Sequence, residues 1–150
     1  MRVYFDTSVI IAAILSAKGG SAQLLTYHKL AVIRGIISQT VIDELLEKTS
    51  KLKKTKYELE KFIAESGLLV YKRISSEEIK IYRGMVDTED LHIIAGAKRT
   101  KCTHLVTLDK RHLLRPEIQK KFTPLAIVSP RELLEKIVSK AAADQQTHLK

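Results

Sequence analysis

Cysteine, proline and tryptophan are nearly absent from this chain. Its 150 residues include one cysteine, three prolines and no tryptophan. The single cysteine, Cys102, excludes an internal disulfide and any metal centre built from several thiolates, and we interpret it as a small buried hydrophobic residue. Five tyrosines and three phenylalanines are too few to indicate the aromatic platform on which many RNA-binding domains stack bases.

Long hydrophobic runs are also missing, as is a basic leader followed by an apolar segment. No repeat, low-complexity block or proline-rich linker divides the chain. Its composition, 45% hydrophobic and 29% charged, is typical of one globular domain. We therefore expect a single cytoplasmic domain over residues 1–140, no membrane association, and a flexible tail at residues 141–150.

Acidic residues are outnumbered by basic ones. There are 26 lysines and arginines against 17 aspartates and glutamates, which leaves a formal charge of +9. Such an excess is typical of nucleic-acid-binding proteins, although basic proteins also bind acidic partners or carry solvated lysine-rich faces. The basic run at residues 48–56 is interpreted as a solvated face.

Short runs rich in valine and isoleucine alternate with segments of helical period, which predicts an α/β fold with a mostly parallel five-stranded central sheet. The predicted strands cover residues 2–5, 31–37, 68–74, 104–108 and 125–128. The predicted helices cover residues 8–15, 21–28, 39–48, 76–86, 89–101 and 131–140, and a further amphipathic helix ends at Gly67.

Two aspartates, Asp6 and Asp109, directly follow predicted strands. In an open parallel sheet, ligands bind at the carboxyl ends of the strands, near the point where the strand order reverses. Parallel neighbouring strands would bring both carboxylates to one edge of the sheet. An aspartate after a strand is also a common helix N-cap, and that explanation suffices for Asp6 taken alone.

Two further acids lie on predicted helices. Glu44, in "SQTVIDELLEK", is placed to form a surface salt bridge with Lys48 four residues later. Asp90, in "VDTEDLHIIAGAKRTK", could belong to an acidic capping box in which Asp87 is the N-cap. The spacing does not distinguish these structural roles from metal ligation.

The ordered segments "FDTSVI", "VIDELL", "DTEDLHIIAGA" and "HLVTLDK" together resemble the PIN-domain nucleases, over about residues 2 to 138. The resemblance implies a three-layer α/β/α fold. It also implies a cluster of four acids that holds one or two divalent metal ions and cuts RNA, usually single-stranded, leaving a 5′-phosphate and a 3′-hydroxyl. The matching acids are Asp6, Glu44, Asp90 and Asp109, with Thr7, Ser8, Thr107 and Asp87 as auxiliary residues.

Two other segments, "GGSAQLL" and "IVSPRELL", are similar to the toxin branch of this family (VapC-like). Membership of that branch implies a small antitoxin protein as a partner and commonly a homodimer. The same resemblance is compatible with an RNA-processing nuclease that is not a toxin. Among more distant alternatives, an aspartyl phosphotransferase would need a second acid where Ser8 stands, and an inactive nucleic-acid-binding module would gain nothing from acids facing phosphate.

Clustered carboxylates repel one another, and a hard cation such as Mg²⁺ or Mn²⁺ relieves that repulsion. We hypothesise that Asp6, Asp90 and Asp109 ligate metal, and that Glu44 ligates a second ion or orients a water. His92 is expected to point away from Asp90.

When the four site acids are set aside, the chain has thirteen acidic residues and twenty-six basic ones. Contacts with the RNA backbone are predicted for lysines and arginines near the last two motifs, and His104 and His112 are weaker candidates for approaching phosphate. The predicted RNA-binding residues are Lys98, Arg99, Lys101, Lys110, Arg111 and Arg115.

Overall fold

Five parallel strands form the centre of the molecule in a computed structural model that describes residues 1–148. The strand order is β3-β2-β1-β4-β5, and every neighbouring pair is parallel. The strands are β1 (Arg2–Phe5), β2 (Arg34–Ser38), β3 (Leu69–Tyr71), β4 (His104–Val106) and β5 (Ala126–Val128). The chain builds one side of the sheet from β1 to β3 and then crosses to β4 on the other side of β1, so the strand order reverses between β1 and β4.

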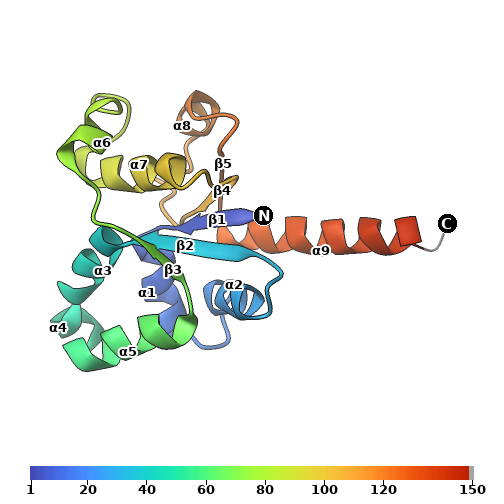
Figure 1. Cartoon of the computed structure of the whole chain (residues 1–150), viewed down its shortest axis with the longest axis horizontal. Coiled ribbons are helices and arrows are strands. Elements are labelled where there is room, and N and C mark those ends of the chain that lie inside the picture. The colour runs from blue at the N-terminus through green and yellow to red at the C-terminus, as the bar shows by residue number, and fades with distance from the viewer. Residues whose placement is uncertain (149–150) are drawn as a thin grey trace.

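Helices cover both faces of the sheet, which gives the expected three-layer α/β/α architecture (Figure 1). One face carries α1 (Thr7–Leu15), α2 (Gly20–Lys29), α3 (Gln39–Leu46), α4 (Thr49–Leu52) and α5 (Lys56–Ser66). The other carries α6 (Ser76–Lys80), the short 3₁₀ helix η1 (Thr88–Asp90), α7 (Leu91–Arg99) and α8 (Pro116–Lys121). Within residues 1–148 no single helix is long and apolar enough to cross a membrane, while α1 and α2 reach that length only as a pair bent by 100°.

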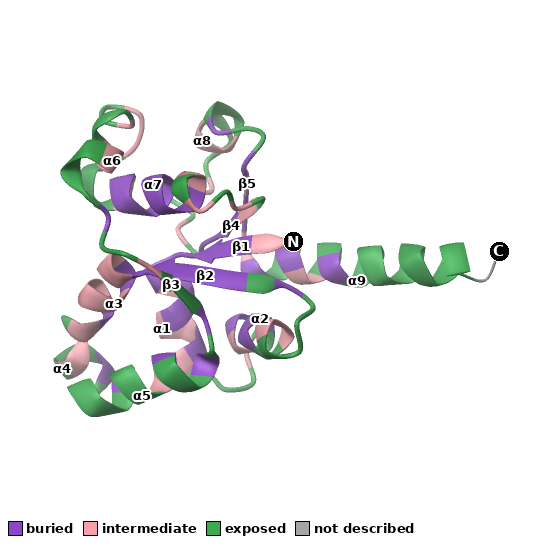
Figure 2. Cartoon of the chain, viewed as in Figure 1, coloured by how far each residue is buried: buried purple, intermediate pink, exposed green. Residues whose placement is uncertain are grey.

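The strands are apolar on both faces because helices cover them from both sides. Figure 2 shows the inner strands and the inward surfaces of α1 and α7 as buried. Tyr4 and Phe5 of β1, Ile37 of β2, and Leu105 of β4 are among the largest fully buried side chains. This central packing fixes the ends of the strands, and therefore the positions of the residues that follow them.

A glycine allows α7 to lie close to β1. A Cβ atom at Gly96 would lie 2.8 Å from Cε2 of Tyr4, and closer still to the hydroxyl end of that ring. Real Cβ contacts essentially never reach such distances, and the fully buried ring has little room to move. The close packing of Gly96 on Tyr4 therefore determines how near the start of α7 lies to the end of β1.

The last helix is longer than the sequence predicts. A helix was expected at residues 131–140 and a flexible tail from residue 141, but α9 (Pro130–His148) continues helically through most of that segment. Its first part packs against α2, and its outer part extends from the body of the protein as an exposed helix (Figures 1 and 2). Residues 149–150 lie outside the described residues.

The helices predicted at residues 76–86 and 89–101 are interrupted in the structure. The helix predicted at residues 76–86 ends at Lys80, and turns lead from there to Gly84, whose φ of 81° ends any regular helix. The helix predicted at residues 89–101 is split into η1 and α7. As a result, Asp90 lies at the junction where the chain changes helical type.

Candidate active site

The four acids singled out by the sequence all lie at the carboxyl edge of the sheet. Asp6 directly follows β1, and Asp109 lies in the loop after β4. Glu44 is on α3, which begins where β2 ends, and Asp90 immediately precedes α7. Because the strand order reverses between β1 and β4, this is the region where ligands bind in open α/β sheets.

Asp6 is the most deeply buried of these acids, and hydroxyl groups hold it in place. It is 8% exposed. Its Oδ2 accepts hydrogen bonds from Thr107 Oγ1 at 2.6 Å and Ser8 Oγ at 2.9 Å. The same two hydroxyls accept backbone N–H bonds from Asp109 at 3.1 Å and from Leu108 at 3.2 Å. The polar neighbours therefore link the end of β1 to the loop that carries Asp109.

The acids are close enough to disturb one another's ionisation. Burial raises the pKa of Asp6 above its usual range, opposed by the hydrogen bonds from Thr107 and Ser8, and the charge of Glu44 raises it further. Burial, with the charges of Asp109 and Asp6, raises the pKa of Asp90 to about 6. This coupling indicates that the four carboxylates share one electrostatic environment.

Glu44 has a partner that its sequence context did not suggest. Its Oε1 contacts Nε2 of His92, whose side chain is almost completely buried on α7. From the sequence, His92 was placed only relative to Asp90, and its contact with Glu44 was not predicted. The alternative Glu44–Lys48 salt bridge is not among the ion pairs of residues 1–148.

His112 lies between two acids. Its Nε2 is 2.9 Å from Asp87 Oδ2, its Nδ1 is 3.3 Å from Asp109 Oδ2, and its backbone N–H donates to Asp109 Oδ1 at 3.2 Å. When its ring is protonated, His112 can donate to both carboxylates at once. The sequence suggested only a weak phosphate contact here, because the approach of Asp87 depends on the tertiary fold.

The tightest group of metal-binding atoms differs from the predicted quartet. Within the described part of the chain, one set of three ligand atoms lies within 4.8 Å of one another, and it comprises Asp87, Asp90 and His112. Asp87 was expected to be a cap or an outer residue, yet its side chain makes no capping hydrogen bond. The oxygen-rich donor set nevertheless suits a hard cation such as Mg²⁺ or Mn²⁺.

The structure also shows what Asp6, Thr7 and Ser8 contact at the start of α1. Asp6 occupies the N-cap position of α1, but its carboxylate makes no capping bond and is bound by the hydroxyls of Ser8 and Thr107 instead. Thr7 is buried next to it, and its hydroxyl has no hydrogen-bond partner among the described residues. Of the two hydroxyls that follow Asp6, Ser8 is therefore the one that binds it.

The structure separates the six predicted RNA-binding residues into two groups. Lys110 and Arg111 are exposed beside Asp109, and Arg115 pairs with Glu117 nearby. Lys98, Arg99 and Lys101 lie at or just beyond the end of α7, and nine residues of helix separate Asp90 from that end, or about 13 Å. There Lys98 Nζ donates to Phe122 O at 3.2 Å, and Arg99 Nε lies 3.2 Å from Glu78 Oε2.

The family model described as "PIN domain" matches residues 2–111 of this chain. The chain belongs to the PIN domain family. PIN domains are nucleases that generally depend on divalent metal ions. The match runs from β1 to the residues just after Asp109, so it includes all four acids of the site.

A solved structure provides an independent comparison of the fold. A chain in the crystal structure of VapBC2 from Rickettsia felis, bound to a DNA fragment from their promoter, is similar to this PIN domain with a TM-score of 0.61. The two sequences are 20% identical, and the alignment covers 86% of this chain and 98% of that one. No curated protein matches the sequence.

Proposed function

We propose that this PIN domain is a divalent-metal-dependent endoribonuclease that cleaves single-stranded RNA. The observation that supports the proposal is the electrostatic coupling of Asp6 with Glu44 and of Asp90 with Asp6 and Asp109, all on segments near the carboxyl edge of the sheet. These residues come from four separate segments, and the charges of Asp109 and Asp6 help to raise the pKa of Asp90 to about 6. Such mutual repulsion has a functional explanation if the carboxylates together bind a cation.

The chain's own residues have distinct roles in this proposal. Ser8 and Thr107 orient Asp6, His92 orients Glu44, and His112 positions Asp109. A bound Mg²⁺ or Mn²⁺ would lower the pKa of a water molecule bound to it and would stabilise negative charge on the phosphoryl oxygens. In this proposal Lys110 and Arg111, which are exposed beside Asp109, contact the phosphates that flank the scissile bond.

RNA as the substrate is supported by the net charge of +9 and by the sequence resemblance to RNA-cleaving PIN domains. We further propose that the protein is the toxin of a toxin–antitoxin pair, with a small antitoxin protein as its partner and a homodimer as its assembly. This role is supported by the toxin-like segments of the sequence and by the similarity to a chain of VapBC2.

A cleavage assay tests the enzymatic proposal. Labelled single-stranded and structured RNAs would be incubated with the protein and Mg²⁺, Mn²⁺ or a chelator. We expect cleavage of single strands with metal only, and a loss of about 10³-fold in Asp6→Asn and Asp109→Asn, because each removes several kcal/mol of transition-state stabilisation. Asp144→Asn, an identical substitution on the exposed part of α9, is the matched control and should retain full activity.

Cleavage that survives the chelator and both site substitutions would reject the mechanism. Binding of RNA without cleavage in any metal would instead indicate an inactive binding module. For the toxin role, induced expression in cells should arrest growth with the natural chain and not with Asp6→Asn. Normal growth with an active enzyme would favour an RNA-processing role.

A further inference from the structure

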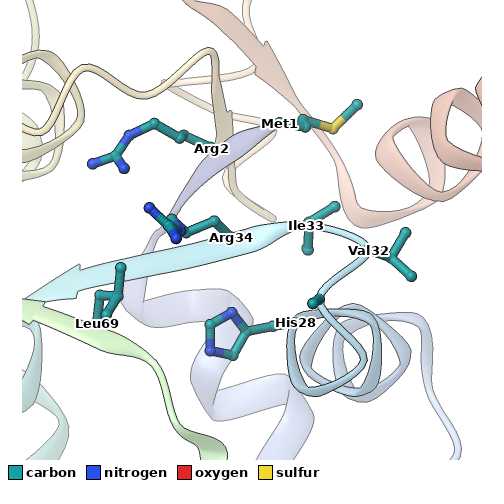
Figure 3. A pocket seen from close by; sticks show the side chains of 8 residues that line it. Met1, Arg2, His28, Val32, Ile33, Arg34 and Leu69 are labelled. Carbon is teal, nitrogen blue, oxygen red and sulfur yellow. The ribbon is translucent and has the colours of Figure 1, made fainter.

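A second pocket lies at the opposite, amino edge of the sheet, where β1 and β2 begin. It has a volume of about 520 Å³, within the range of small-molecule sites. Arg2, Arg34 and His28 line it together with apolar residues that include Val32 and Leu69, and its lining contains no acidic residue (Figure 3). The pocket is therefore positive on one part of its wall and apolar on another.

The two arginines are direct neighbours across the sheet. Arg2 and Arg34 are register partners in parallel strands, so their side chains leave the same face of the sheet about 5 Å apart. Figure 3 shows both guanidinium groups extending in the same direction. Like charges in directly opposed positions repel each other, and an anion bound between them would remove that repulsion.

The arginines differ in how much of their hydrogen-bonding capacity the protein already uses. Arg2 donates from Nε and Nη2 to the carbonyl oxygen of Thr100 at 3.1 and 2.8 Å, which holds its side chain against the end of α7. Arg34 forms no side-chain hydrogen bond or ion pair within residues 1–148. Arg2 is therefore a cation held in place by the protein, and its neighbour Arg34 is a cation whose hydrogen-bond donors are all available.

The other residues that line the pocket offer contacts for a ligand larger than a small anion. His28 Nδ1 accepts the backbone N–H of Gly35 at 2.8 Å, which fixes the imidazole ring and leaves the proton of a neutral ring on Nε2. Leu69 of β3 is 46% exposed, so this part of the pocket presents apolar surface to solvent. An apolar surface of this kind could pack against a base or a sugar.

We propose that this pocket binds one nucleotide unit, with its phosphate between Arg2 and Arg34 and its base or sugar against Leu69. Two guanidinium groups match the charge and multiple oxygens of a phosphate. An acidic peptide side chain would satisfy the arginines but leave the apolar wall unused. The unit is either a free nucleotide or part of a strand, and the site does not depend on the proposed nuclease activity, because β1 separates it from Asp6 by about 13 Å.

Nuclear magnetic resonance of arginine Nε–H groups tests the proposal in the full chain, with a chelator present and in an Asp6→Asn background to prevent cleavage. The probes are inorganic phosphate, adenosine monophosphate, adenosine and sodium acetate. Adenosine monophosphate should shift the Nε signals of Arg2 and Arg34 and the amide of Gly35, and should bind more tightly than phosphate. Adenosine and acetate should produce no saturable shift at the same concentrations.

Substitution of Arg34 provides the decisive comparison, since the Arg2 clamp on Thr100 also supports the fold. Arg34→Ala should weaken binding of adenosine monophosphate at least fivefold, and Arg34→Lys should weaken it less. Lys140→Ala, which removes the same charge from exposed α9, should leave the affinity unchanged. The amide spectrum of each variant verifies folding.

A 2′-O-methyl oligonucleotide distinguishes the two sources of the nucleotide. If the site holds part of a strand, Arg34→Ala should reduce the slope of log K against log salt by about 0.7, the value for one phosphate contact on a single strand. If only the mononucleotide responds to Arg34→Ala, the site is for a free nucleotide. The proposal is overturned if neither ligand shifts the arginine signals, if Arg34→Ala binds as tightly as the natural chain, or if acetate competes as well as the nucleotide.

Discussion

The two ends of the central strands carry side chains of opposite charge, and the protein contacts these side chains to different extents. At the carboxyl edge, Asp6 is buried and accepts two hydroxyl hydrogen bonds, and Glu44 contacts a buried histidine. At the amino edge, Arg2 and Arg34 face a pocket, and Arg34 is bonded to no side chain of the described residues. Asp6 and Glu44 are held by protein side chains, whereas at the amino edge Arg2 is held only by Thr100 O and Arg34 remains available to solvent and ligand. Changes at the first edge should therefore affect chemistry and stability, and changes at the second should affect binding.

Displacing α7 from β1, the strand that both edges share, should have the largest effect on the fold. Gly96→Ala would place a methyl group against the buried ring of Tyr4 and push α7 away from β1. We expect a loss of about 1–3 kcal/mol in the free energy of unfolding, as for other overpacked cores. Urea denaturation measures this loss, and Ala97→Gly on the same helix is a comparison that adds no volume. An unchanged midpoint for Gly96→Ala would show that the close approach does not matter.

Replacing His92, the histidine that contacts Glu44, should weaken metal binding at the carboxyl edge and leave the amino edge unchanged. We expect His92→Leu to reduce metal affinity about 10- to 100-fold, the usual cost of losing a residue that orients a metal ligand, and His92→Gln to recover part of it. Calorimetric titration with Mn²⁺ at a temperature where all variants are folded measures the affinity. If the two variants lose stability equally but bind metal like the natural chain, His92 is only a packing residue.

The raised pKa of Asp90 predicts a stability that depends on pH in the metal-free protein. Because the folded pKa is about 6 and the ordinary value is 3.8, the folded state binds the proton more tightly. Stability is therefore greatest below the unfolded pKa and falls as the pH rises through 6. With allowance for partial exposure, Asp90→Asn should stabilise the metal-free protein by about 1–2 kcal/mol at pH 7.

Denaturation at several pH values with a chelator measures the effect of Asp90→Asn. The difference from the natural chain should shrink to nothing below about pH 3, under the ordinary pKa of 3.8, where the aspartate is largely protonated in both the folded and unfolded states. A benefit that is equal at both pH values would contradict a charge-based origin. The same variant should lose cleavage activity, so stability and function would change in opposite directions.

The smallest effect is expected at the amino edge. Arg34→Gln removes one of two neighbouring like charges, and without a ligand it should stabilise the fold by only a few tenths of a kcal/mol at low salt. Screening at 1 M salt should abolish the difference, because the Debye length there is about 3 Å. Differential scanning calorimetry at the two salt concentrations measures it. A marked destabilisation would show that Arg34 supports the fold and would weaken the contrast between the two edges.

Most of the fold was predictable because its signals are local, whereas the four main acids were selected by the resemblance to PIN-domain nucleases and their roles stay a prediction. The bounds of β1 agree with the prediction, and helices α1, α2 and α3 begin within one residue of it, since each depends on short apolar runs or periodicity. The prediction was weaker where long-range contacts decide the structure. The backbone N–H of Ile74 bonds to Thr40 Oγ1 of α3 at 2.9 Å, and β3 ends at Tyr71 although the predicted strand continues to residue 74.

By itself, the sequence determined the strand and helix order, the excess of basic residues, and the placement of Asp6 and Asp109 after apolar strands. Only the tertiary structure decided that His92 meets Glu44, that His112 joins Asp87 to Asp109, and that Lys98 and Arg99 lie away from the acids. Local pattern encodes secondary structure through side-chain periodicity. Which side chains meet depends on strand order and register, and these result from packing the whole core.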